Sequence, residues 1–286
     1  MSDYIKDFLL TDCELGDQGY QRVLLQLYGL PGNGKSSFIN SCKFVLDGGE
    51  FTVQAEAADS YGGFTKHRKP YKLTDTLWMV DNRGMSKLDG FQTGEIFAQL
   101  VNLLPLDEKV EWCEDFNKNV ARLLGEHKKN NYKDFIVPVF IHSACNKLKT
   151  EDLPVYRELL HKSTDLTGIE PFIVLTHKSN GGLESMRNVF KDMGMEKIYA
   201  LENYTTKDHQ EVREKHEEII NILTKVVADV IFRMRFKSDP TNESYNHLQF
   251  LLEYMKTSAD RKRGEEIERK MAEAQRNAKK SSCPLL

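Results

Sequence analysis

Cysteine is scarce in this sequence, and its spacing carries no recognisable framework. The chain has 286 residues and five cysteines, an odd number, with no C-x-x-C pair. This pattern excludes a disulfide scaffold and a C-x-x-C zinc site as the basis of the fold. It is typical of a protein that works in a reducing compartment, so we expect a cytoplasmic location.

Long apolar runs and a surplus of positive charge are missing as well. No stretch approaches the roughly 20 apolar residues that a membrane-spanning helix requires, and the first residues lack the basic and apolar regions of a signal peptide. Lys and Arg number 40 against 43 Asp and Glu, a formal net charge of −3. This balance gives no indication of bulk binding to nucleic acid, and we expect no nucleic-acid partner.

One glycine-rich segment organises what is present. Residues 29–36, Gly-Leu-Pro-Gly-Asn-Gly-Lys-Ser, fit the phosphate-binding pattern G-x-x-x-x-G-K-[ST]. An apolar run at 22–28 precedes this segment, and apolar residues at helical spacing follow it over 36–46. Strand, glycine-rich loop and helix in this order are the context that supports the motif.

Each residue type in this loop suits a polyphosphate. Glycines let successive backbone N–H groups curl around phosphates, and the following helix offers free N–H groups at its positive end. We expect Lys35, exposed in the loop, to reach the terminal phosphates, and Ser36 to bind Mg²⁺. The residues expected to contact the nucleotide from this segment are Gly29, Pro31, Gly32, Asn33, Gly34, Lys35, Ser36 and Ser37.

Two further segments are candidates for the same site. An apolar strand over 76–80 leads into Asp81-Asn82-Arg83-Gly84, where Asp81 is expected to hold Mg²⁺ and Gly84 to contact a γ-phosphate. Residues 58–69 are polar, basic and glycine-containing. They are either a loop that orders over phosphates near Thr65 or an ordinary surface loop.

The alternation of strands and helices predicts an α/β fold: a doubly wound, mainly parallel sheet of P-loop NTPase type with a C-terminal helical extension. Such a sheet gathers the loops after residues 28, 80, 175 and 201 around one site. The predicted strands are 22–28, 51–55, 76–80, 134–142, 171–176 and 197–201. The predicted helices are 36–46, 95–104, 110–124, 151–162, 183–193, 210–236 and one from about 243.

These elements divide the chain into four parts. We expect a polar N-terminal arm over 1–20, the α/β domain over 21–237, a helical extension over 238–280 and a tail over 281–286. The second half of the extension is mostly charged, which fits a solvated helix, a short coiled coil or a surface-binding arm. The tail, Cys283-Pro284-Leu285-Leu286, fits a prenylation signal behind a basic stretch or is an accidental cysteine. In the first case we expect association with a membrane surface.

The ordered set of loops resembles the GTPase-like domain of the interferon-induced protein 44 family, among the TRAFAC-type GTPases. The resemblance covers roughly residues 20–235. It rests on the phosphate loop with its continuation over 37–41, and on the segments 71–73, 175–177 and 203–204. It implies a nucleotide switch that binds GTP/GDP with Mg²⁺, meets a protein partner and acts in immune response. It also implies nucleotide contacts from Thr176, His177, Lys178 and Asn203.

Two positions depart from related GTPases. Where an aspartate normally pairs with guanine, this chain has Ser179, whose hydroxyl cannot act as a bidentate charged acceptor. We therefore predict weak selectivity for guanine. Where a glutamine normally orients the attacking water, the chain has Met85, which predicts slow or partner-dependent hydrolysis, with Arg83 as a candidate for stabilising charge.

Two other classes of function stay open at this point. The phosphate loop also resembles those of small-molecule kinases, although the sequence shows no arginine cluster in a lid-like position. The third alternative is a scaffold protein that works through protein contacts without nucleotide.

Overall fold

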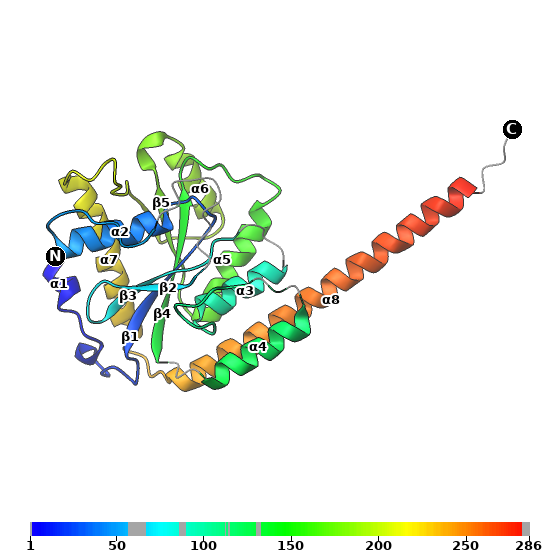
Figure 1. Cartoon of the computed structure of the whole chain (residues 1–286), viewed down its shortest axis with the longest axis horizontal. Coiled ribbons are helices and arrows are strands. Elements are labelled where there is room, and N and C mark those ends of the chain that lie inside the picture. The colour runs from blue at the N-terminus through cyan, green and yellow to red at the C-terminus, as the bar shows by residue number, and fades with distance from the viewer. Residues whose placement is uncertain are drawn as a thin grey trace.

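The computed structural model describes residues 2–56, 67–85, 90–111, 113, 115–129 and 133–281. Its centre is a six-stranded sheet in the order β2-β3-β1-β4-β5-β6 (Figure 1). All neighbouring strands are parallel except β2, which runs antiparallel to β3 at the edge. The mainly parallel α/β class predicted from the sequence is confirmed. The strands are β1 Arg22–Tyr28, β2 Lys69–Lys72, β3 Leu77–Asp81, β4 Asp134–Ser143, β5 Phe172–Thr176 and β6 Ile198–Ala200.

The two central strands, β1 and β4, are almost wholly buried because both of their faces are covered. Pro138 lies inside β4 opposite Gln26 of β1. Pairing of β4 with β5 begins only at Val139. The proline, which has no N–H to donate, therefore stands just before the ladder on that side starts.

Helices cover both faces of the sheet (Figure 1). One face packs against α1 (Ser2–Lys6), α2 (Lys35–Asp47) and α7 (Arg213–Arg233). The other packs against α3 (Gly90–Leu100), α5 (Leu153–Thr167), α6 (Leu183–Asp192) and the first part of α8 (Pro240–Ser281), with α4 (Phe116–Lys129) beside α8. Short 3₁₀ turns occur at η1 (Leu10–Asp12) and η2 (Lys178–Asn180). Among the described residues, no helix combines the length and the apolar character that crossing a membrane requires.

The N-terminal segment is not the polar arm expected from its composition. Ile5, Phe8 and Leu10 are buried in the core on the α7 side of the sheet, and α1 contacts α7. Tyr4, Leu9 and Leu15 stay exposed, but the buried apolar side chains attach the segment to the core.

The strand predicted over 51–55 is also wrong, and the structure shows why. Asn40 of α2 accepts hydrogen bonds from the N–H groups of Gln54 and Ala55 at 2.9 and 2.8 Å, and donates to the Ala55 carbonyl at 2.8 Å. One side chain thus satisfies the backbone groups that a neighbouring strand would otherwise pair. The edge strand is instead β2, whose residues 69–72 begin within the segment that was predicted to be a loop.

The boundaries of five helices differ from the prediction by three residues or more. Two of them, predicted over 151–162 and 210–236, run over Leu153–Thr167 and Arg213–Arg233. The helices predicted over 95–104 and 110–124 run over Gly90–Leu100 and Phe116–Lys129. The last helix starts at Pro240 and reaches Ser281, 42 residues in one element. Its first part packs through Leu248, Leu251 and Met255, whereas all residues over 260–271 are exposed and project away from the sheet (Figure 1).

Candidate functional site

The glycine-rich segment over 29–36, called the phosphate loop after the pattern it matches, leaves the end of β1 and enters α2 at Lys35. Gly29 has φ +142°, and a Cβ at that position would overlap the carbonyl oxygen of Ile141 in β4. Gly34 has φ +87°, and a Cβ there would lie 2.9 Å from Nδ2 of Asn203. Both glycines are therefore required by the close approach of the loop to neighbouring backbone and side chains.

Lys35 is buried, which corrects the expectation that it is exposed in the loop. It is the first residue of α2, and its Nζ donates to the carbonyl oxygens of Gly29 at 3.2 Å and Leu30 at 3.0 Å. The side chain folds back beneath the loop, where only 6% of the residue is exposed. Burial lowers the pKa of its ammonium group, an effect that the nearby Asp81 charge opposes.

Ser36 and Asp81 meet directly, although 45 residues separate them. The Ser36 hydroxyl donates to Oδ2 of Asp81 at 2.6 Å. Asp81 is buried at the end of β3, and its Oδ1 has no hydrogen-bond partner among the described residues. Burial raises the pKa of this carboxyl group, opposed by Lys35 and by the Ser36 hydrogen bond.

This pair fits one hard divalent cation. Mg²⁺ prefers oxygen ligands and is usually held by one or two protein groups together with phosphate oxygens and water. A buried carboxylate oxygen without a partner, beside a serine hydroxyl, offers that donor set. In the described part of the chain, no cluster of three or more His, Cys, Asp or Glu residues could hold a metal alone. A cation at this pair would therefore depend on phosphate oxygens.

The segment after Asp81 lies against the phosphate loop. A Cβ on Gly84 would lie 3.2 Å from both Lys35 Nζ and Pro31 Cγ. The Met85 N–H donates to the Gly29 carbonyl at 3.3 Å, while the Met85 side chain is buried in the core. Arg83 directs its guanidinium to the carbonyl of Val110. The structure thus brings Gly84 to the loop, whereas the Met85 side chain is turned into the core.

Arg68 was not recognised from the sequence. It is fully buried, donates to Oδ1 of Asn82 at 2.8 Å, and also bonds the carbonyls of Gln99 and Leu104. This guanidinium ties the chain before β2 to the residue that follows Asp81. In the sequence it stood in a basic run, where nothing distinguished it from its exposed neighbours.

Asn33 joins the phosphate loop to two neighbouring strands. Its Oδ1 accepts from Asn146, just after β4, at 2.8 Å, and its carbonyl accepts from the Thr176 hydroxyl at 2.9 Å. Its Nδ2 is buried and has no partner in the described structure. Thr176 therefore reaches the loop as expected, and Asn146 is an addition that no sequence motif indicated.

The two residues after Thr176, His177 and Lys178, point in different directions. His177 adopts φ +55°, with Nδ1 3.0 Å from the Thr176 hydroxyl and 3.1 Å from that of Ser143. Lys178 instead forms ion pairs with Glu214, at 2.8 Å, and Glu218, both on α7. The structure does not bring Lys178 to the phosphate loop, because the carboxylates of α7 hold it.

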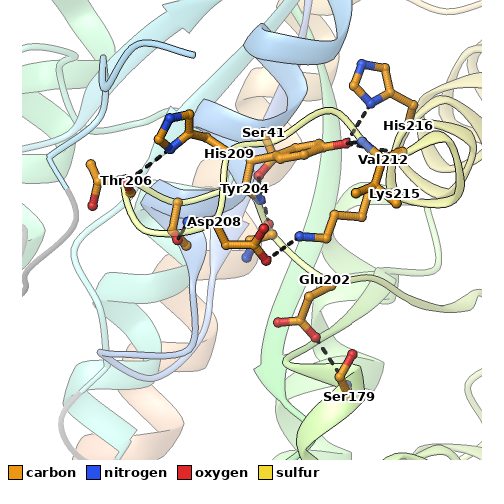
Figure 2. A network of polar contacts seen from close by, with 12 residues as sticks. Ser41, Ser179, Glu202, Tyr204, Thr206, Asp208, His209, Val212, Lys215 and His216 are labelled. Carbon is orange, nitrogen blue, oxygen red and sulfur yellow. Dashed lines mark hydrogen bonds and ion pairs between the residues drawn. The ribbon is translucent and has the colours of Figure 1, made fainter.

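The loop after β6 is fixed to α2 through Ser41. Its hydroxyl oxygen lies 3.2 Å from Oδ1 of Asn203. It also accepts from the Tyr204 N–H at 2.9 Å (Figure 2). Asn203 also donates to the Gly34 carbonyl at 3.4 Å. The Tyr204 hydroxyl lies 2.7 Å from Nδ1 of His216 on α7. Asn203 is therefore at the phosphate loop, as the sequence predicted.

One carboxylate of this loop contacts the turn after β5. The Ser179 N–H donates to Oε2 of Glu202 at 3.1 Å (Figure 2). No motif in the sequence indicated Glu202, because no spacing rule connects it to position 179.

Two predicted residues, Thr65 and Cys283, lie outside the described residues. Ser37 is partly buried at the start of α2, where its carbonyl accepts from the Ser41 hydroxyl at 2.7 Å. No model of a known protein family matches this chain, and a search of curated proteins found no match either.

Proposed function

We propose that this chain is a nucleotide switch: a GTPase-like protein of P-loop type that binds GTP/GDP with Mg²⁺ and hydrolyses GTP slowly. The observation that carries the proposal is the pairing of Ser36 with Asp81 directly beneath the glycine-rich loop. A serine at the start of the helix and an acid at the end of a neighbouring strand are the two protein groups that P-loop proteins place around Mg²⁺.

The residues in and around the loop would each contact a different part of the nucleotide–Mg²⁺ complex. Ser36 and Asp81 would hold Mg²⁺, which neutralises charge on the β- and γ-phosphates when bound. Lys35 would exchange the carbonyls of Gly29 and Leu30 for phosphate oxygens, and free N–H groups of the loop would face the anion. Gly84 stands next to Lys35 and Pro31, and its N–H would contact the γ-phosphate.

Slow or partner-dependent hydrolysis follows from the surroundings of Gly84. The Met85 side chain is buried and apolar, so it cannot orient a water molecule. Arg83 is bound to the Val110 carbonyl and must leave it to stabilise transition-state charge. A protein partner that supplies the missing group is therefore part of the proposal. Membership of the interferon-induced protein 44 family, with a role in immune response, belongs to the same proposal.

Titration of the full-length protein with GTP and ATP, each with Mg²⁺ and with EDTA, tests this function. We expect GTP binding that weakens at least tenfold when Mg²⁺ is chelated. Turnover of bound ATP with transfer to a small molecule would indicate a kinase. Absence of binding to either nucleotide at millimolar concentration would leave the scaffold alternative and contradict the proposal.

A further inference from the structure

We propose that Glu202 reads the guanine base, as the acceptor that position 179 lacks; this rests on the function proposed above. Ser179 occupies the third position after Thr176, and it cannot supply a carboxylate. The Ser179 N–H nevertheless bonds the carboxylate of Glu202, at 3.1 Å (Figure 2). A charged acceptor is thus present at this turn, delivered from the neighbouring strand.

The sheet explains how Glu202 arrives there. β5 and β6 are parallel and paired, and the Leu201 N–H donates to the Leu175 carbonyl at 2.9 Å. The residues that follow the two strands consequently emerge side by side at the same edge. Asn203, the next residue, reaches back to the Gly34 carbonyl in the phosphate loop. Glu202 therefore lies between the turn after β5 and an anchor on the phosphate loop.

The carboxylate retains acceptor capacity for a ligand. Within the described structure, its one hydrogen bond uses Oε2, and the residue is half-buried. Lys178, which precedes Ser179 in the chain, is already paired with Glu214 and Glu218. Glu202 is thus held in place without being neutralised by that lysine.

Base chemistry determines which nucleotide such an acceptor favours. Guanine presents an N1–H and an exocyclic amine side by side, two donors that match one carboxylate. Adenine presents an unprotonated N1 at the same edge, which repels a carboxylate. A charged, two-point contact is stronger than a neutral one, so Glu202 would restore the guanine preference that Ser179 alone cannot give.

A purely structural role for Glu202 makes a different prediction. If the carboxylate only caps the 3₁₀ turn η2, a glutamine would serve, because its carbonyl oxygen also accepts from the Ser179 N–H. A base-reading role is sensitive to that change, since glutamine offers an acceptor and a donor where guanine needs two acceptors. Xanthine, with an oxygen in place of the exocyclic amine, matches the amide instead.

The test compares wild type with Glu202→Gln in the full chain by calorimetry, using GTP, ATP and xanthosine triphosphate with Mg²⁺. We expect at least a tenfold loss of GTP affinity and at least a tenfold gain in the ratio of xanthosine triphosphate to GTP affinity. Glu170→Gln is the matched control, because Glu170 also accepts from backbone N–H groups, those of Glu196 and Lys197, at the opposite edge.

The outcomes separate the two proposals. If wild type binds GTP and Glu202→Gln behaves like Glu170→Gln, the inference is overturned while nucleotide binding stands. If wild type binds no nucleotide, both fall. Should Glu202→Gln fail to fold, wild type alone decides the matter with inosine triphosphate, which lacks the exocyclic amine. Affinity at least tenfold below that for GTP supports Glu202, and equal affinity overturns it.

Discussion

Two sets of acceptors compete for the Lys35 ammonium group: the carbonyls of its own loop and, in the proposed function, the phosphates of a nucleotide. We predict that Lys35→Ala weakens binding of Mg²⁺–GTP at least a hundredfold, because the ammonium group that bonds the loop carbonyls disappears. The fold should persist, since the change also removes a buried charge that costs desolvation energy. Calorimetry and thermal melting measure both effects.

A matched variant shows whether the effect is local. Lys191→Ala removes the same charge from an exposed position on α6 and should leave affinity within about twofold, since exposed charges far from a site are screened by salt. Unchanged affinity in Lys35→Ala would place the nucleotide elsewhere and contradict the assigned site.

Lys35 also makes nucleotide binding depend on pH. Burial lowers its pKa in the free protein below the ordinary 10.5, and a bound triphosphate should raise it again, because anions favour the charged form. At pH values between the pKa of Lys35 in the free protein and its pKa in the complex, nucleotide binding is therefore accompanied by proton uptake. Affinity should be highest below the lowered pKa and fall as pH rises through that window.

Calorimetry in two buffers of different ionisation enthalpy measures this proton uptake directly. The uptake should be unchanged in Lys191→Ala, which keeps both Lys35 and the affinity for nucleotide. Affinity that rises with pH across the window would contradict the assignment of Lys35 as the titrating group.

At the scale of elements, the loop after α2 depends on a single amide. Asn40 is buried and makes three hydrogen bonds to the backbone of Gln54 and Ala55. We predict that Asn40→Ala lowers the free energy of unfolding by about 2–4 kcal/mol, because buried backbone groups lose their partners. Urea denaturation measures it. Asn221→Ala, at an exposed position of α7, should change stability by less than about 0.5 kcal/mol. Equal effects would mean that water replaces the amide.

The sequence predicted those elements whose patterns are local. Strand, glycine loop and helix at 22–46 form a contiguous signal, and the acid at the end of the 76–81 strand follows from the same logic, so the Ser36–Asp81 pair was expected. The segment over 51–55 alternates like a strand, but its N–H groups bond the side chain of Asn40. Because Asn40 lies more than ten residues earlier, the alternation within 51–55 cannot reveal this partner.

The missed site residues share that property. Glu202 and Asn146 reach Ser179 and Asn33 only because parallel strands end at one edge of the sheet. Burial likewise cannot be seen in the sequence: Lys35 was expected to be exposed, and Arg68 looked like part of a solvated basic run. Both cations donate hydrogen bonds to backbone carbonyls. Because every residue has a carbonyl, no sequence motif indicates which ones will bind a buried cation.

At the scale of the whole molecule, α8 has a packed half and a projecting half. Leu251 is fully buried, whereas residues 260–271 are all exposed. We predict that Leu251→Ala costs about 2–5 kcal/mol, the usual range for a buried leucine that leaves a cavity. Removal of residues 264–286 should cost less than about 1 kcal/mol, because the exposed part of this segment buries no apolar side chain.

Chemical denaturation of the two variants against wild type measures the difference. A truncated protein that unfolds as readily as Leu251→Ala would show that the distal half contributes to the core, in contrast to the exposure of residues 260–271.

The packing of α8 on α3 has a mechanical consequence. Met255 of α8 rests on Gly94 of α3, and Tyr254 packs edge-to-face on Phe97 with ring centroids 5.0 Å apart. Beyond this contact with α3 the helix continues to Ser281, a length of about 40 Å at 1.5 Å per residue. A tilt of about 10° at the contact moves the far end by roughly 7 Å over that length. Any repacking at α3 would therefore be magnified at the far end of α8.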